Sequence, residues 1–193
     1  MNHAAFAGEL ALLWQDVPLP RESFVRGVAL HDRGYGELDN DPIGGIPRER
    51  WLDIQRRGFA MRDDDPIVDL VACMHIRRLV RGAVPEFDEA LPALRDRAGV
   101  DETTALAADA ITNLCDRISF DVCCEEPAEG SVGEIAYSYD GERTVTVEPW
   151  PFTLPGFSLL LVGFRSDGYP EQLERVLDPI AFRRPPDRTA AAA

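Results

Sequence analysis

Three histidines and two aspartates are the residues of this chain whose types suit metal chemistry. His31 and Asp32 are adjacent at the end of the apolar stretch FVRGVAL, and a divalent ion commonly accepts an imidazole nitrogen and a carboxylate oxygen together. His3, His75 and Asp116 lie in other segments, and the chain has no fourth histidine. Because the burial of such groups without partners is costly, their placement on apolar segments predicts one shared metal site.

Each of these residues, taken alone, also has a purely structural explanation. The dipeptide at 31–32 could be exposed at a helix end, His3 could be a frayed terminal residue, and His75 could be a hydrogen-bonded core residue. Asp116 could pair with Arg117 instead of with a metal. The agreement of all of them in helical, core-side positions favours the metal site.

Amphipathic helices are the elements expected to position these side chains. Hydrophobic residues at helical spacing, capping residues and proline or glycine breaks predict helices over about 3–15, 20–32, 47–58, 66–80, 86–97 and 101–123. His3 starts the first helix and the 31–32 dipeptide ends the second. His75 lies on the buried stripe of the fourth helix, and Asp116 lies beside the apolar stripe of the last. Pro92 is expected to kink or interrupt the fifth helix.

The chain beyond Gly130 changes from helical spacing to short runs typical of strands. The runs EIAYSY and RTVTVEPW, separated by residues 140–142, predict a hairpin. The run FSLLLVGF predicts a third, more buried strand. Together these runs place a β element at about 134–165.

The last part of the chain is predicted to return to helix and then to lose order. A short helix is expected after Pro170, with its inward positions at Leu173, Val176 and Leu177. Residues 186–193 are expected to be a disordered tail. The predicted fold is therefore mainly α, a single helical-bundle domain over residues 1–185 with a small antiparallel hairpin or sheet near the C-terminus.

Composition limits the class of protein. With 193 residues and 45% hydrophobic content, the chain suits one folded domain with a sizeable core. A net charge of −14 disfavours nucleic acid and anionic lipid as partners. No apolar run approaches the ~20 residues of a membrane span, and the N-terminus lacks the basic start of a secretory signal. We therefore expect a cytoplasmic protein without a membrane or nucleic-acid partner.

Residue usage excludes further chemistries. All 20 basic residues are arginines, which excludes a lysine nucleophile, a Schiff base and a phosphate-binding loop lysine. The four cysteines show no CxxC spacing and are expected to be reduced core thiols. Any anion bound by this chain must therefore be held by arginine.

The residue order H…HD…H…D resembles that of the HD-domain superfamily of metal-dependent phosphohydrolases. The chain is similar, in particular, to an uncharacterised HD-like family known as domain of unknown function 3891. The blocks that carry the likeness span nearly the whole chain and read NHAAFAGELALLW, ALHDRGYGELDNDP, CMHIRRLV, LCDRISFDVCC and VEPWPF. The resemblance implies an HD-like helical bundle with His3, His31, Asp32 and Asp116 as the primary ligands. It implies that His75 is a ligand of a second metal or an acid–base residue.

Such a site implies a phosphohydrolase-like enzyme that acts on a small phosphorylated molecule. A divalent ion (Mn, Fe, Mg or Zn), with one expected and room for two, would lower the pKa of its bound water toward ~7 and so supply the nucleophile. Asp32 would orient that water. Arg78, one helical turn after His75 and expected to project near it, or else Arg77 or Arg33, would stabilise charge on the phosphate.

Two other functions stay open from the sequence. Three histidines with carboxylates also suit iron, and some HD-domain proteins are di-iron oxygenases, so an oxygenase acting on a small metabolite is one alternative. In that case a second metal would lie near His75. A non-catalytic metal- or ligand-binding module is the other alternative. Glu37, in an acidic loop, could add an oxygen ligand or simply be solvated.

Overall fold

The computed structural model describes residues 3–35, 46–165, 172 and 174–186, which form helices and one mixed sheet. The helices are α1 (His3–Leu12), α2 (Arg21–Ala29), α3 (Arg48–Ala60), α4 (Pro66–Val80), α5 (Pro85–Ala98) and α6 (Glu102–Cys124). The strands are β1 (Ala128–Val132), β2 (Ile135–Tyr139), β3 (Thr144–Glu148), β4 (Phe157–Phe164) and β5 (Arg175–Arg183).

The helices lie where hydrophobic spacing and capping residues predicted them. Asp65 caps α4, and its side chain accepts a hydrogen bond from the Ile67 amide at 2.9 Å. Asp101 caps α6 and accepts from the Thr104 amide at 2.9 Å. Pro92 lies inside α5 without ending it, so the predicted interruption of that helix is not seen.

The prediction of a mainly α fold with a small antiparallel hairpin is wrong. The described strands form a five-stranded sheet in the order β1-β2-β3-β5-β4. β3 and β5 are parallel, whereas the other neighbouring pairs are antiparallel. The sheet uses residues from 128 to 183, well beyond the predicted element at 134–165. The architecture is therefore α/β, with a mixed sheet at one end of a helical body.

The two strands that the sequence did not predict are β1 and β5. β5 occupies most of the segment predicted as a short helix, and Val176, Ile180 and Phe182 are buried on one face of it, at strand spacing. Leu177 is 49% exposed instead of inward, and Leu173 lies outside the described residues. β1 has the sequence AEGSV, which contains a single β-branched residue, and it forms by pairing with β2. Of the predicted disordered tail, residues 187–193 likewise lie outside the described residues.

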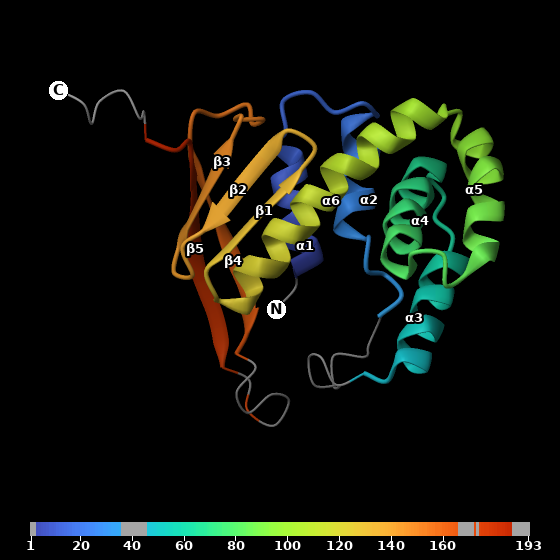
Figure 1. Cartoon of the computed structure of the whole chain (residues 1–193), viewed down its shortest axis with the longest axis horizontal. Coiled ribbons are helices and arrows are strands. Elements are labelled where there is room, and N and C mark those ends of the chain that lie inside the picture. The colour runs from blue at the N-terminus through green and yellow to red at the C-terminus, as the bar shows by residue number, and fades with distance from the viewer. Residues whose placement is uncertain (1–2, 36–45, 166–171, 173, 187–193) are drawn as a thin grey trace.

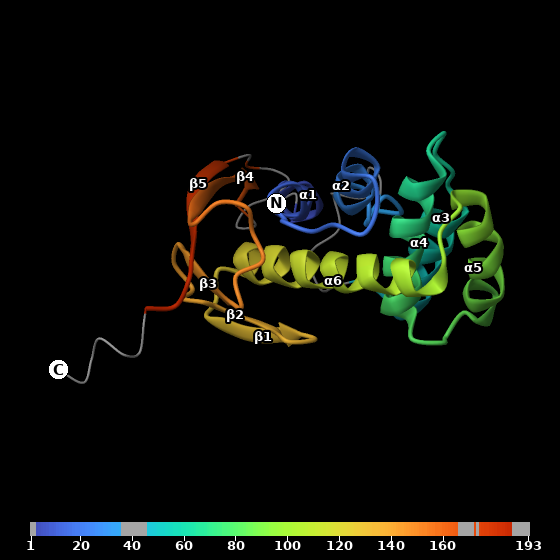
Figure 2. The ribbon, with the colours of Figure 1, turned by 90° about the horizontal axis from the view of Figure 1, so that it is seen from above.

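Figure 1 shows the sheet at one end of the molecule, α3, α4 and α5 at the other, and α1, α2 and α6 between them. Figure 2 shows α6 running along the length of the molecule from the side of α5 to the sheet. One hydrophobic core lies under the sheet, where the rings of Phe6 and Phe182 are 6.1 Å apart. A second core joins α3, α4 and α5, where Phe59 and Phe87 stack at 4.0 Å.

The α4 and α6 helices contribute to both cores, and this fixes their relative position. On α4, Val71 belongs to the first core and Leu70 to the second. On α6, Ala108 belongs to the first core and Ala105 to the second. Two helices held from both sides provide a rigid frame for any site built between them.

Glycine allows the turn after α2 to lie directly against α3. A Cβ atom on Gly34 would lie 2.4 Å from the Ile54 carbonyl oxygen and 3.0 Å from the Gly58 amide nitrogen. The neighbouring atoms are backbone and cannot move aside cheaply. This close approach fixes the position of the turn that carries His31 and Asp32.

The Gly34→Ala substitution is therefore expected to destabilise the protein. Overpacking against backbone should lower the free energy of unfolding by about 1–3 kcal/mol, measured by urea denaturation. Gly156→Ala is the matched control, because its Cβ would meet only the Phe182 carbonyl oxygen at 3.4 Å. Equal stability of the two variants would contradict the tight turn.

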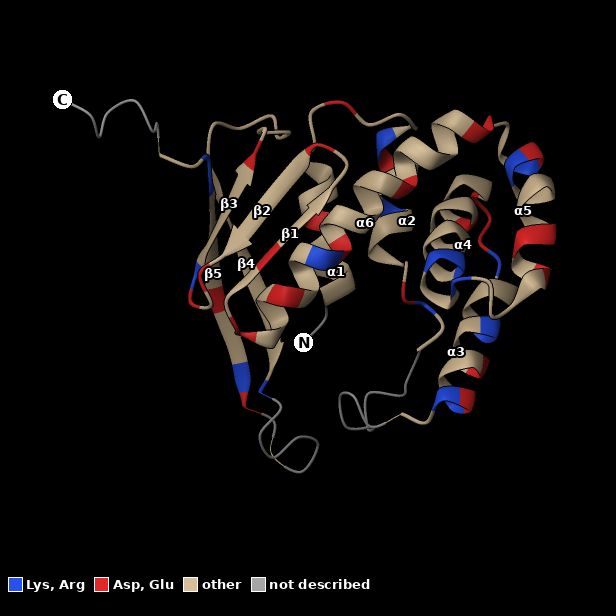
Figure 3. Ribbon diagram, viewed as in Figure 1, with Lys and Arg blue, Asp and Glu red and all other residues tan. Residues whose placement is uncertain are grey.

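Charged side chains are distributed over the outer helices. In Figure 3, basic and acidic residues both occur along α3 and α5, and the basic ones do not gather into one stretch in this view.

Among the described helices, none combines the length and apolar character that a membrane span requires.

Candidate metal centre

The five side chains singled out in the sequence converge at one place from four segments of the chain. His3 is the first residue of α1, His75 lies in α4, and Asp116 lies in α6. His31 and Asp32 lie in the turn that follows α2. His31 and His75 are buried, and the other three side chains are 14–23% exposed.

The Nε2 atoms of His3 and His31 both lie close to the two carboxylates. The Nε2 atom of His3 lies 3.0 Å from Asp32 Oδ2 and 3.6 Å from Asp116 Oδ1. The Nε2 atom of His31 lies 3.3 Å from Asp116 Oδ1 and 3.9 Å from Asp32 Oδ2. The two Nε2 atoms are 3.4 Å apart. Each Nε2 atom thus lies within 4 Å of one oxygen of each carboxylate. Two overlapping groups bring their donor atoms within 4.8 Å of one another, namely His3, His31 and Asp116, and His31, Asp32 and His75.

These separations match the edges of a metal coordination shell. With metal–ligand bonds of about 2.1 Å, neighbouring ligands are about 3.0 Å apart around an octahedral ion and about 3.4 Å apart around a tetrahedral one. The donor set of imidazoles and carboxylates suits Mn, Fe and Zn in particular. Two largely buried carboxylates also require positive charge nearby. The residues present therefore fit a divalent ion.

His31 is held in the orientation that a ligand needs. Its Nδ1 lies 2.6 Å from the backbone carbonyl oxygen of Val28, and a carbonyl can only accept, so Nδ1 carries a proton. In the neutral ring the lone pair is then on Nε2, which faces His3 and Asp116. A backbone partner of this kind fixes the tautomer of many metal-binding histidines.

His75 approaches the opposite side of the two carboxylates. Its Nε2 lies 3.3 Å from Asp32 Oδ1, and its Nδ1 lies 3.5 Å from Asp116 Oδ2. Arg78 Nη2 is closer to this ring, at 3.1 Å from Nδ1. The Nε2 atom is buried and makes no well-aligned hydrogen bond to a described residue. Each carboxylate therefore has one oxygen toward His3 and His31 and the other toward His75.

The electrostatics of the cluster favour ionised carboxylates. Burial opposes the charge on Asp32, but the contacts with His3 and His75 hold the pKa of its carboxyl far below the usual range. Burial also opposes the charge on Asp116, but the contact with His31 and the charges of the histidines lower the pKa of that carboxyl. Both groups are therefore negative at neutral pH and available to a cation.

The pKa values of the two buried histidines are shifted in opposite directions. Burial works against protonation of His31, but the hydrogen bond to Asp116 and the charges of Asp32 and Asp116 outweigh it and raise the pKa of the ring. For His75, burial and the charge of His31 prevail over the nearby carboxylates and lower the pKa to about 4. In the metal-free cluster, His31 therefore takes up an additional proton at a higher pH than His75 does.

The three candidate arginines contact different partners. Arg78 lies beside His75, at the edge of the cluster. Arg33 turns away and donates to Asp69 Oδ1 at 2.7 Å, and exposed Arg77 donates to Asp88 Oδ1 at 2.5 Å. Arg78 is thus the one of the three with a contact to the cluster.

Two other expectations from the sequence concern Arg117 and Glu37. Arg117, the alternative partner of Asp116, donates to the Ser131 carbonyl at 3.0 Å instead. Glu37, the possible oxygen ligand, lies outside the described residues.

Asp109 is a residue of this region that the sequence analysis did not single out. Its Oδ2 lies 3.5 Å from Arg78 Nε. Burial raises the pKa of its carboxyl, and the charge of Arg78 only partly opposes this. Asp109 precedes Asp116 by two helical turns on α6, and this spacing of two aspartates on one face was the signal that could have identified it.

Tyr35 is a second residue near the cluster that the sequence did not indicate. Its hydroxyl oxygen accepts from Trp51 Nε1 at 3.0 Å and from Gln55 Nε2 at 3.4 Å. Burial and the charges of Asp32 and Asp116 raise the pKa of this phenol. Tyr35 is therefore a neutral group tied to α3 and within the electrostatic field of the cluster.

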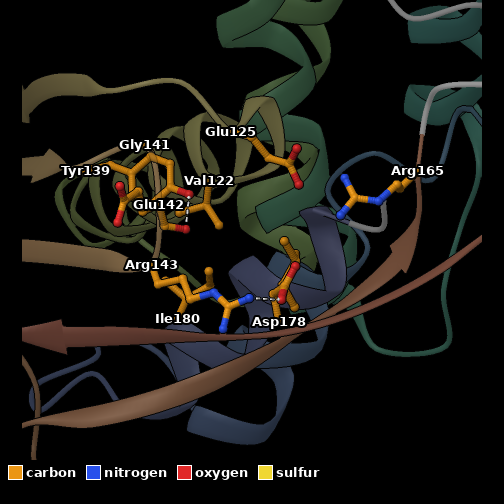
Figure 4. A pocket seen from close by; sticks show the side chains of 10 residues that line it. Val122, Glu125, Tyr139, Gly141, Glu142, Arg143, Arg165, Asp178 and Ile180 are labelled. Carbon is orange, nitrogen blue, oxygen red and sulfur yellow. Dashed lines mark hydrogen bonds and ion pairs between the residues drawn. The ribbon is translucent and has the colours of Figure 1, made fainter.

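A pocket of about 260 Å³ lies elsewhere, between the end of α6 and the sheet (Figure 4). Arg143 donates to Asp178 in it at 2.7 Å, and Arg165 lies 3.2 Å from Glu174. None of the five cluster residues lines it. The pocket is therefore separate from the candidate metal centre.

Metal binding at this centre is expected to weaken as the pH falls. The pKa of His31 lies above its ordinary value, so a proton competes with an entering ion for this ring at a higher pH than it would at an ordinary histidine. Below that pKa, the apparent affinity for Mn²⁺ should fall about tenfold per pH unit, because one proton competes with one ion. Above it, the affinity should level off.

Isothermal titration at pH 7 in two buffers of different ionisation enthalpy measures the proton release. We expect up to one proton per bound ion. An affinity that stays constant between about pH 6 and 8 would contradict the raised pKa of His31.

Comparison with known proteins identifies the family of the chain. A family model described as "Protein of unknown function (DUF3891)" matches residues 1–163, a range that includes all five residues of the cluster. No curated protein and no solved structure matches the chain. The chain therefore belongs to the DUF3891 family of proteins of unknown function.

Proposed function

We propose that this protein is a metal-dependent hydrolase that releases phosphate from a small phosphorylated molecule. The observation that carries the proposal is the position of the Nε2 atoms of His3 and His31, which lie 3.4 Å apart and 3.0 to 3.9 Å from an oxygen of Asp32 and an oxygen of Asp116. Such spacing suits one divalent ion, with Mn, Fe, Mg and Zn as candidates. The ligand order H, HD and D also supports a distant relationship to the HD-domain superfamily.

The residues around the ion have separate tasks in this proposal. A divalent ion at this position supplies a water of lowered pKa and polarises a phosphoryl oxygen. Asp32 bridges the two sides of the centre, since Oδ2 faces His3 and Oδ1 faces His75. Arg78 brings a permanent positive charge to the edge of the cluster, where it attracts and orients the phosphate.

The charge of the whole chain supports a small substrate. The net charge of −14 repels an extended polyanion such as nucleic acid. A single phosphate group carries far less charge than such a polyanion, and the ion and Arg78 would offset part of it. A small phosphomonoester is therefore the substrate class that we propose.

The test is to purify the protein without chelator, to determine its metal content, and to assay phosphate release from p-nitrophenyl phosphate and a panel of phosphomonoesters. We expect about one ion per chain, and turnover that EDTA abolishes and Mn²⁺ restores. Phosphate release that survives chelation, or the absence of any bound ion, would contradict the proposal.

A di-iron oxygenase is the second candidate, and one observation favours it. Asp32 Oδ1 and Asp116 Oδ2 both face His75, at 3.3 and 3.5 Å, so the two carboxylates could bridge two ions. Iron at about two equivalents per chain would support this candidate. A bound ion without turnover of any tested substrate would support a non-catalytic binding module.

A further inference from the structure

We infer that Arg78 fixes the tautomer of His75, so that His75 is a hydrogen-bond donor that positions Asp32 and not a metal ligand. The inference starts from the contact between Arg78 Nη2 and His75 Nδ1 at 3.1 Å. A guanidinium group has donors only. Its partner nitrogen must therefore accept, which leaves the proton of the imidazole on Nε2.

The competing tautomer has a poorer environment. A proton on Nδ1 would face the N–H of Arg78 at 3.1 Å, and the carboxylate that could accept it, Asp116 Oδ2, is farther away at 3.5 Å. The same contact disfavours a doubly protonated ring, in which both nitrogens would be donors.

The Arg78 side chain has an acidic neighbour on α6. Asp109 Oδ2 lies 3.5 Å from Arg78 Nε, and both side chains are largely shielded, at 16% and 22% exposure. Arg78 Nε makes no well-aligned hydrogen bond to a described residue, so the attraction between the two charges is what favours this position of the guanidinium. A connected path of contacts therefore runs from α6 to the candidate ligands, through Asp109, Arg78, His75 and Asp32.

The Nε2–H of His75 has one acceptor in front of it. Asp32 Oδ1 lies 3.3 Å from Nε2, and this nitrogen has no other acceptor in the hydrogen bonds of the described residues. A buried N–H is costly when unpaired, so a small rotation of the carboxylate that completes this bond is favourable. The bond would keep Asp32 Oδ2 toward His3 and His31.

His31 and His75 are thus opposite tautomers. His31 donates from Nδ1 to the Val28 carbonyl and offers a lone pair at Nε2, whereas His75 accepts at Nδ1 and offers a proton at Nε2. A metal needs the lone pair. The centre should therefore hold one ion, bound on the side of His31 and not at His75. The role of Asp32 as a ligand rests on the proposed function, but the tautomer of His75 does not.

The first experiment reads the tautomer in the metal-free protein. Long-range ¹H–¹⁵N correlation spectra at a pH where the rings are neutral report which nitrogen of each histidine carries the proton, and three histidines make the assignment simple. We expect the proton of His75 on Nε2 and that of His31 on Nδ1. Arg78→Met should shift His75 toward the Nδ1 tautomer, and Arg77→Met, a change at the neighbouring exposed arginine, should not. A proton on Nδ1 of His75 in the unaltered protein would overturn the inference.

The second experiment separates a positioning residue from a ligand by Mn²⁺ titration. His75→Gln keeps an N–H near the position of Nε2, so we expect one ion per chain and an affinity within about threefold of the unaltered protein, whereas His75→Leu should weaken binding about 10–100-fold. Loss of the ion in His75→Gln, or a second ion that this variant removes, would overturn the inference. If the unaltered protein binds no ion, the proposed function fails, and the spectra still decide the tautomer.

Discussion

The Asp116→Asn variant is expected to lose its metal ion while keeping its fold. Asp116 contributes Oδ1 to the shell, at 3.3 Å from His31 Nε2 and 3.6 Å from His3 Nε2. Loss of outer partners alone costs about 10–100-fold in metal affinity, so replacing a direct ligand should cost more than about 100-fold. Phosphate release should fall to the level of the chelated protein. Mn²⁺ titration and metal analysis of the purified variant measure the effect.

Asparagine is chosen because its size matches that of aspartate, so the packing of α6 is retained. Glu102→Gln is the matched control, since it removes a carboxylate from the same helix at a side chain that is 70% exposed. Near-normal affinity in Asp116→Asn, with normal affinity in Glu102→Gln, would rule out Asp116 as a ligand.

The largest loss of stability is expected from Asp69→Ala. Asp69 is fully buried and accepts hydrogen bonds from Arg33 Nη1 at 2.7 Å, from the Asp63 amide at 2.9 Å, and from Arg97. The side chain of Arg33 is only 6% exposed. Removing one partner of a buried ion pair leaves the other charge uncompensated, which costs about 3–5 kcal/mol.

This substitution should also weaken metal binding, because Arg33 directly follows Asp32 in the chain. Arg33 additionally donates to the Gly58 and Met61 carbonyls, at 2.9 and 2.8 Å, and so ties the turn to the end of α3. Without Asp69, the Arg33 side chain would lose this ionic partner and keep the two carbonyl contacts, and the turn would be able to shift. Urea denaturation measures the stability, and Mn²⁺ titration measures the second effect.

Asp88→Ala is the control for the Asp69 variant. Asp88 also pairs with an arginine, Arg77, but both side chains are more than 40% exposed. Exposed pairs contribute little, so the free energy of unfolding should change by no more than about 0.5–1 kcal/mol. Similar losses in the two variants would contradict a special role for the buried pair.

The position of the helices was determined by local sequence. Asp65 and Asp101 cap α4 and α6 through bonds to amides two and three residues ahead, and hydrophobic spacing marks the buried faces. Such signals act within one or two helical turns, so they can be read without knowledge of the fold. The same spacing placed His3, His75 and Asp116 on helices.

The sheet was decided by tertiary structure. Residues 173–177 have hydrophobic positions that also suit a helix, but β5 is stabilised between β3 and β4, whose segments lie at least ten residues away in the chain. β1 likewise depends on its neighbour β2. Hydrogen bonds between strands are non-local, and so no local pattern could distinguish these alternatives.

The details of the candidate centre were decided in the same way. Helical spacing already placed Arg78 near His75, one turn away, whereas only packing turned Arg33 toward Asp69 and Arg77 toward solvent. Residue type alone determined which groups could bind a metal. Which nitrogen of each ring bears a proton depends on partners from other helices, because a hydrogen bond is set by position in space and not by separation in the chain.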